Sequence, residues 1–157
     1  MLGVLTLLIL AGCGGSTSAK TQTVQGDGFR FEAPAGWTVV RKGPSVAVVD
    51  GDVNRVEVVR FTLEKPYNAA LFAAAARELD GVASRLATQL KGKVTSSSTS
   101  EVGGRKARSY TIDYGSGKTQ EITFVLEGAN EFQLLCRRDA NASNDACTQL
   151  LSTFALG

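Results

Sequence analysis

The feature that most restricts the fold is one segment of helical period lying between two groups of β-type alternation. In residues 71–90, apolar side chains recur every three or four positions, which is the spacing of one face of an α-helix. These positions are Leu71, Ala75, Leu79, Val82, Leu86 and Leu90. Asn68 can cap the start of this helix, and Gly92 is a suitable stop. The chain is therefore expected to be an α+β protein with one long helix.

Alternating apolar and polar residues predict strands on both sides of this helix. The expected strands cover residues 29–32, 37–41, 45–49 and 54–63 before it and, from Lys93 onward, residues 109–114, 119–126 and 132–136. The alternation slips at Val58 and Val59, which predicts a β-bulge there. Short turns join neighbouring strands, so we expect antiparallel hairpins. A short amphipathic helix is predicted from Cys147 to Phe154.

The N-terminus has the pattern of a bacterial lipoprotein signal. An apolar run from Leu2 ends in Leu10-Ala11-Gly12-Cys13, a site of the kind that a lipoprotein signal peptidase cuts before the cysteine. The run is too short to cross a bilayer as a helix. We expect residues 1–12 to be a signal peptide and Cys13 to carry a lipid that anchors the protein to the outer face of the cell membrane. No basic residue precedes Lys20, so Met1 is expected to be an internal methionine.

The residues after Cys13 have the composition of a flexible tether. Residues 14–26 are rich in Gly, Ser, Thr, Lys and Gln and contain few apolar side chains. We therefore assign residues 13–26 to the lipidated cysteine and tether, and residues 27–157 to one folded domain. The alternative for the apolar run at the start is a buried strand or helix of an ordinary domain.

Cys136 and Cys147 remain once Cys13 is assigned to the lipid. In an exported protein such a pair is most simply a disulfide, which here would join the last predicted strand to the short helix. A zinc site is a weaker alternative, because the chain has no histidine and two thiolates alone bind zinc poorly. A redox pair would normally have its cysteines in a Cys-x-x-Cys motif.

Composition and charge disfavour several function classes. The net charge is only +2 and no basic cluster is present, which argues against nucleic-acid binding. The absence of histidine excludes the familiar Ser-His-Asp and Cys-His arrangements, and we expect no cofactor, no metal and no enzyme activity. An envelope hydrolase or transferase that uses a carboxylate pair stays open as an alternative. Its candidates are Glu57, Glu121 and Asp113, which lie on predicted strands.

Four aromatic residues are candidates for the wall of an apolar pocket between helix and sheet. They are Trp37, Tyr67, Phe72 and Tyr110. Trp37 is the only tryptophan and follows a Pro-Ala-Gly turn. A tryptophan in such a position is more often part of the core, and this alternative stays open.

The segment Gly28-Phe29-Arg30-Phe31, followed by Pro34-Ala35-Gly36-Trp37, resembles the opening of PsbP-like domains. The end of the chain is similar too, with an aromatic-x-Leu-x-Cys strand at Phe132 to Cys136 before the helix that contains Cys147. The resemblance covers about residues 26–156 and extends to small actinobacterial lipoproteins of the LpqN type. It implies an αβα sandwich around a central antiparallel sheet of about six strands, with a long helix and a C-terminal helix. It also implies binding or scaffolding without a shared catalytic centre.

Together these features favour a lipid-anchored, non-enzymatic binding or accessory protein of the cell envelope. Its partner would be an envelope protein or a small apolar ligand held between helix and sheet. A purely structural surface lipoprotein is the remaining alternative. The presence of a pocket or an apolar patch would separate these two possibilities.

Overall fold

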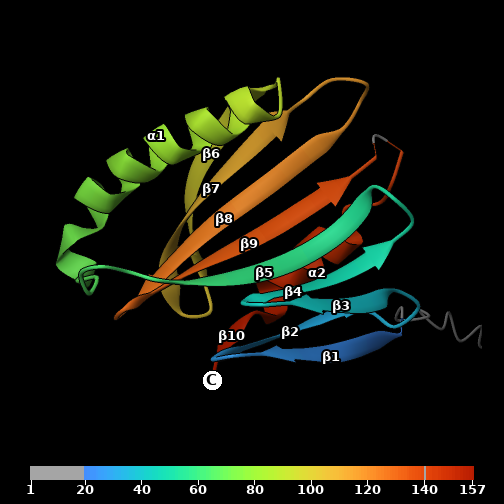
Figure 1. Ribbon diagram of the computed structural model, residues 1–157, viewed down its shortest axis with the longest axis horizontal. Helices are drawn as coiled ribbons and strands as arrows, with labels where there is room; N and C mark the ends of the chain where they lie inside the picture. Colours follow the sequence, from blue (N-terminus) through green and yellow to red (C-terminus); the bar gives the residue numbers. More distant parts are fainter. Residues whose placement is uncertain (1–19, 140) are drawn as a thin grey trace, which may run out of the picture.

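The computed structural model describes residues 20–139 and 141–157 (Figure 1). The predicted signal peptide, Cys13 and the first part of the predicted tether lie outside these residues. Among the described helices, none is both long and apolar enough to cross a membrane. The described chain builds a seven-stranded sheet, a three-stranded sheet and two α-helices, so the α+β class is confirmed.

The seven-stranded sheet is antiparallel and has the strand order β3-β4-β5-β9-β8-β7-β6. Its strands are β3 (Thr38–Lys42), β4 (Ser45–Asp50), β5 (Asn54–Thr62), β6 (Lys93–Val102), β7 (Arg105–Asp113), β8 (Thr119–Glu127) and β9 (Asn130–Arg138). Hairpins before and after the long helix form its two halves, and β5 pairs with β9 to join them. β5 keeps a regular register against β4 and β9, so the predicted bulge at Val58 and Val59 is wrong. Because β5 is a central strand, Val58 and Val59 can both be apolar while facing opposite sides of the sheet.

A three-stranded sheet lies beside the large one, so the single sheet of about six strands is also corrected. It consists of β1 (Thr21–Gly26), β2 (Phe29–Pro34) and β10 (Ala155–Leu156). Both outer strands pair antiparallel with β2, and β10 brings the C-terminal residues back beside Phe29 and Arg30. The strands predicted around residues 29–32 and 37–41 therefore belong to different sheets.

Residues 21–26 were expected in the tether but form strand β1. Val24 is 2% exposed and lies opposite Phe31 of β2 in the strand register. Gln22 donates from Nε2 to the backbone oxygens of Pro34 and Trp37, at 2.9 and 2.8 Å. A strand with one buried apolar side chain has almost no alternation to detect. Its order comes from hydrogen bonds to β2 rather than from its own composition.

The large sheet has a hydrophobic core on each face. The face that we call the α2 face is covered by α2 (Asp145–Thr153) and the small sheet, and its core includes Phe31, Val56 and Leu134. The opposite α1 face is covered by α1 (Phe72–Gln89), whose Leu79 packs in a cluster with Phe124. One helix on each face agrees with the sandwich implied by the resemblance, except that a second sheet shares the layer of α2.

The ends of the long helix follow local rules with one difference. Asn68 caps a single 3₁₀ turn, η1 (Ala69–Leu71), by accepting the N–H of Ala70 at 3.0 Å, and α1 follows directly. At the other end Lys91, with φ of 55°, takes the left-handed conformation usually found in glycine. Gly92 avoids a steric clash instead, because a Cβ there would lie 2.4 Å from the backbone oxygen of Asp113.

Candidate functional site

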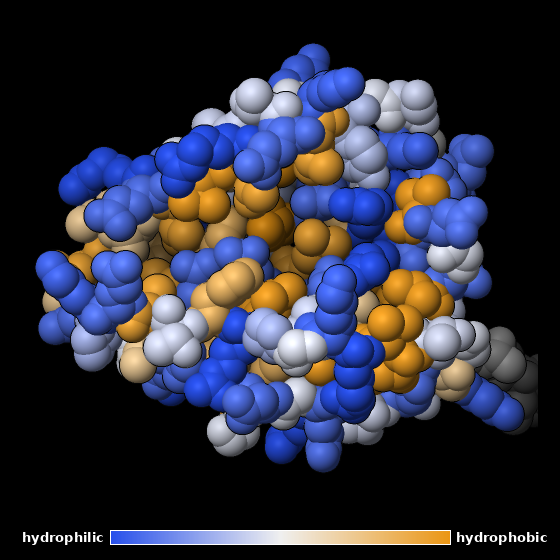
Figure 2. Space-filling model, viewed as in Figure 1, coloured by the Kyte–Doolittle hydropathy of each residue, from blue (hydrophilic) through white to orange (hydrophobic). Residues whose placement is uncertain are grey.

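An apolar cleft runs beside the long helix and is the first candidate site. We call it the α1 cleft. It lies between α1, the connection from β5 to α1, and the adjoining ends of β8 and β9, and its volume is about 230 Å³. Its lining residues are Leu63, Lys65, Tyr67, Ala75, Glu78, Leu79, Val82, Leu126 and Glu131. Figure 2 shows apolar surface along the hollow next to the helix, with hydrophilic residues at its borders.

Backbone hydrogen bonds hold the wall of the α1 cleft opposite the helix. The N–H of Leu63 donates to the oxygen of Ala129 at 2.8 Å, and the N–H of Tyr67 donates to the oxygen of Gly128 at 2.7 Å. The connection is thereby attached to the turn between β8 and β9. Burial, helped by the nearby Glu127 carboxylate, raises the pKa of Tyr67, so its phenol stays neutral at physiological pH.

A polar cluster attaches α1 to the sheet. The hydroxyl of Tyr110 on β7 donates to Asp80 Oδ1 on α1 at 2.6 Å. Arg108 donates to the same oxygen from Nε at 3.1 Å and from Nη2 at 2.9 Å. The hydrogen bonds from Tyr110 and then Arg108 lower the pKa of Asp80, whereas burial and the bond to Asp80 raise the pKa of Tyr110 to about 12. These three groups therefore hold one wall of the cleft in place.

The four aromatic residues predicted to share one pocket do not do so. Tyr67 lines the α1 cleft, and Tyr110 lies under α1 with its ring edge-to-face with Phe124. Phe72 is half-buried at the first residue of α1, where the Lys106 ammonium lies 5.9 Å from its ring centre. Trp37 packs against the core of the opposite, α2 face. The single pocket is wrong because the chain crosses from the small sheet to the large one at Trp37, which leaves this residue on the side away from α1.

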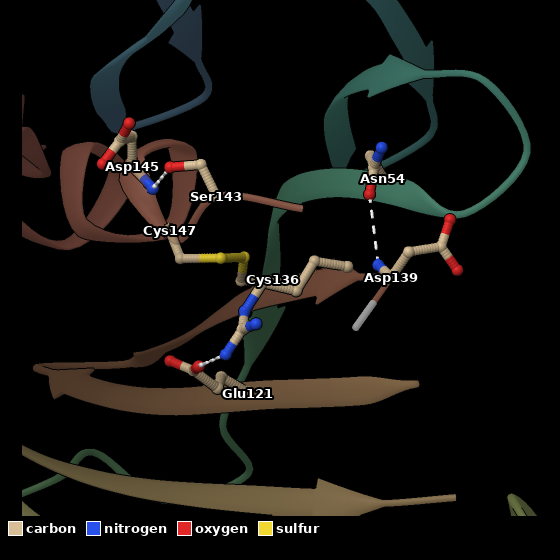
Figure 3. Close-up of a disulfide and its surroundings, with 8 residues drawn as sticks. Asn54, Glu121, Cys136, Asp139, Ser143, Asp145 and Cys147 are labelled. Carbon is tan, nitrogen blue, oxygen red and sulfur yellow. Dashed lines mark hydrogen bonds and ion pairs between the residues drawn. A yellow bond between two sulfur atoms is a disulfide. The ribbon is translucent and has the colours of Figure 1, made fainter. Parts of the chain in front are cut away.

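A second hollow lies on the α2 face, beside the disulfide (Figure 3). The predicted bond between Cys136 on β9 and Cys147 on α2 is present, with the two Cα atoms 5.5 Å apart. We call the adjacent space, of about 280 Å³, the disulfide hollow. It is lined by Pro34, Trp37, Asp50, Asn54, Cys136, Arg137, Arg138, Ala142, Ser143, Asp145, Ala146 and Cys147. Sequence reasoning missed this hollow, although it singled out Trp37 and both cysteines.

The carboxylates proposed for an enzyme do not converge. Glu57 lies on the α1 face, where it accepts hydrogen bonds from Ser45 and from Arg55 Nε, the latter at 2.8 Å. Burial alone would raise the pKa of Glu57, but these hydrogen bonds outweigh it and the pKa is lowered. Glu121 lies on the α2 face, 3.6 Å from Arg138. Asp113 accepts the N–H of Gly115 in the turn after β7.

The described residues also contain no group of three or more histidine, cysteine or acidic side chains that could hold a metal ion. Glu57, Glu121 and Asp113 are therefore not aimed at one reacting atom, whereas the α1 cleft offers apolar surface. Such a surface is suited to binding.

Comparison with known proteins is informative for the fold. No family model matches the chain, and no curated protein sequence does. The solution structure of cyanobacterial PsbP (CyanoP) from Synechocystis sp. PCC 6803 matches over 94% of this chain and 99% of its own, with a TM-score of 0.58 and 17% identity. The chain therefore has a PsbP-like fold.

A crystal structure from Bacteroides thetaiotaomicron VPI-5482 is also similar. It matches over 88% of this chain with a TM-score of 0.54 and 15% identity. The present chain spans 48% of that protein, which is about half its length. At these identities the two likenesses concern the fold alone.

Proposed function

We propose that this protein is a lipid-anchored, non-enzymatic accessory protein of the cell envelope. It binds a small apolar ligand, or an apolar segment of an envelope protein, in the α1 cleft. The observation that supports this most is the cleft itself, because six of its lining side chains are apolar or aromatic and leave surface open beside the helix. The alternative of a purely structural lipoprotein gives no reason for such a cleft.

The size of the α1 cleft sets the expected affinity. A space of about 230 Å³ accepts a short hydrocarbon group rather than a whole lipid. Burying four methylene groups would contribute about 3 kcal/mol, so one such group would bind only weakly by itself. A lipid anchor at Cys13 would compensate, because it holds the cleft at the same membrane as its partner and raises the effective concentration.

The charged residues at the border of the cleft restrict how a ligand enters. Lys65, Glu78 and Glu131 surround the apolar floor. A purely hydrocarbon ligand makes no polar contact with these three groups. An apolar chain with a polar end can place that end among them and form such a contact. We therefore expect amphiphilic ligands to be preferred over hydrocarbons of equal length.

Titration with 1-hexanol tests the binding proposal. Saturable NMR shift changes should be confined to Leu79, Val82, Leu126 and their neighbours. Val82→Asp should abolish these changes, because it places a charge in the cleft. Ser84→Asp is the matched control, since Ser84 is exposed on the same helix and does not line the cleft. Shifts that are spread over the molecule, or that persist in Val82→Asp, would contradict the proposed site.

The anchor requires a separate test, because the residues concerned lie outside the described ones. Metabolic labelling of the bacterial host with an alkyne fatty acid should label the protein. Cys13→Ala should remove both the label and the membrane association. A protein that is recovered unlabelled from the cytosol would refute the envelope location while leaving the cleft proposal testable.

A further inference from the structure

The disulfide hollow is distinct from the α1 cleft, since the two lie on opposite faces of the large sheet. Four segments that are distant in sequence meet there: the turn after β2, the turn between β4 and β5, the end of β9 and the start of α2. Its apolar wall includes Pro34, Trp37, Ala146 and the Cys136–Cys147 disulfide. The hollow therefore offers a flat aromatic surface beside a compact aliphatic one.

The walls of this hollow are held in place before any ligand arrives. The side chain of Gln22 donates to the backbone oxygens of Pro34 and Trp37, which fixes the turn that holds the indole. The disulfide ties the start of α2 to β9, and the N–H of Asp139 donates to Asn54 Oδ1 at 3.2 Å. Figure 3 shows Asn54 and Asp139 joined on one side of the disulfide and Ser143 joined to Asp145 on the other. Such a site needs little ordering upon binding.

The charges around the hollow decide what it can bind. Two arginines line the hollow. Arg137 follows Cys136 on β9, so its side chain points to the α1 face, where it donates to Gln120 Oε1 from Nε at 3.2 Å and from Nη2 at 2.8 Å. Arg138 lies 3.6 Å from Glu121, which offsets its positive charge, and its buried Nε has no hydrogen-bond partner among the described residues.

Asp50 and Asp145 also line the hollow, and within residues 20–139 and 141–157 neither forms an ion pair. The hollow thus combines unpaired negative charge with an indole surface. Both attract a positive charge.

We propose that the disulfide hollow binds the cationic end of a partly apolar molecule, namely an ammonium or guanidinium group on an apolar body. The cation would lie near Asp50 and Asp145, and the apolar body would pack against Trp37 and the disulfide. No group of three or more metal-binding side chains is found among the described residues, and Trp37 adds an indole surface, so the hollow suits an organic cation better than a metal ion. The same chemistry is present in a small amine and in a lysine side chain of a partner protein.

Trp37 is the only tryptophan of the chain, so its intrinsic fluorescence reports on this hollow. Under non-reducing conditions at pH 7, 2-phenylethylamine should produce a saturable change in the fluorescence of the full chain. The neutral isostere 2-phenylethanol should bind at least several-fold more weakly. Added salt should weaken the amine, because both carboxylates are exposed.

Two variants and one control separate the charge effect from a change in folding. Asp50→Asn and Asp145→Asn should each weaken binding of the amine by about twofold to fivefold, the range expected for an exposed ion pair. Asp52→Asn, which removes an exposed charge from the same β4–β5 turn without lining the hollow, should leave binding unchanged. Asp50→Asn lies outside α2, so it stays informative if Asp145→Asn perturbs that helix.

A second probe distinguishes the two sources of the cation. If N-acetyl-lysine N-methylamide also saturates the response, the site takes a lysine side chain of a partner; if only the amine does, it takes a small molecule. Either result supports the proposal when the Asp50→Asn effect is present. Equal binding of the amine and the alcohol, or amine binding that is the same in Asp50→Asn, Asp52→Asn and the unmodified protein, would overturn it.

Discussion

Replacing Tyr110 by phenylalanine tests how the long helix is held against the sheet. The Tyr110 hydroxyl donates to Asp80 Oδ1 at 2.6 Å, and Arg108 donates to the same oxygen. A phenylalanine ring keeps the edge-to-face contact with Phe124, whose centre is 5.9 Å away. The substitution therefore removes one hydroxyl and little packing.

The size of the effect follows from the environment of Asp80. A hydrogen bond to a charged group contributes about 1.5–3 kcal/mol to stability when the pair is well shielded. The Asp80 side chain is 49% exposed and keeps its contacts with Arg108, so water and the guanidinium replace part of the lost interaction. We expect the free energy of unfolding to fall by about 1 kcal/mol at pH 7. For a domain of this size, that lowers Tm by about 3–5 °C.

Urea unfolding as a function of pH gives the substitution a specific signature. In the folded protein burial, and then the bond to Asp80, raise the pKa of Tyr110 from 10.0 to about 12. This contribution to stability is complete below pH 10 and is lost as the pH rises toward 12, so stability should fall less steeply there in Tyr110→Phe. The pKa of Asp80 is lowered, so its contribution is present above the ordinary value of 3.8 and lost below it. The difference between the two proteins should therefore shrink in acid.

Tyr114→Phe is the matched control at pH 7. The Tyr114 hydroxyl is buried and has no hydrogen-bond partner among the described residues. Its removal should be neutral or slightly stabilising. Equal stability of Tyr110→Phe and the unmodified protein at pH 7, or equal losses in the two variants, would refute the role given to the Asp80 contact.

Two further predictions concern the disulfide and the end of the long helix. Replacing Cys136 and Cys147 together by alanine should lower the free energy of unfolding by about 2–3 kcal/mol, because the bond closes a loop between residues 11 apart in the unfolded chain. Urea unfolding under non-reducing conditions measures this, and an unchanged midpoint would show that the bond adds no stability. Gly92→Ala should destabilise by about 1–3 kcal/mol, because its Cβ would lie 2.4 Å from the backbone oxygen of Asp113. Gly36→Ala, whose Cβ meets nothing within 4 Å, should change stability by less than about 0.5 kcal/mol, and equal melting temperatures for the two variants would contradict this reasoning.

Much of the fold could be predicted because its signals are local. The helical spacing from Leu71 to Leu90 predicted α1, and Asn68 marked where the helical segment begins. Alternation predicted the hairpins after the helix, whose buried residues Ile112, Ile122 and Phe124 share the α1 face. The cysteine pair was predictable for a different reason, since in a chain expected to be exported, with Cys13 assigned to a lipid, a disulfide is the simplest use of two remaining cysteines.

The errors arise where the structure depends on a distant partner. β1 has one buried apolar residue, Val24, and is ordered by its hydrogen bonds to β2. The slipped alternation at Val58 and Val59 suggested a bulge, but a central strand has apolar residues on both faces. In each case the local pattern describes one segment, whereas the outcome depends on what packs against it.

The sequence alone determined the two helices and most strands of the large sheet, because the period of apolar residues, the caps and the turns act over a few neighbouring positions. Only the tertiary structure decided how those elements form sites. Trp37 and Tyr67 are equally suited to line a pocket, yet the crossing of the chain from the small sheet to the large one puts them on opposite faces. Side chains on one face of the large sheet cannot contact those on the other face, because the strands lie between them. Which side chains can meet is therefore a property of strand order rather than of residue type.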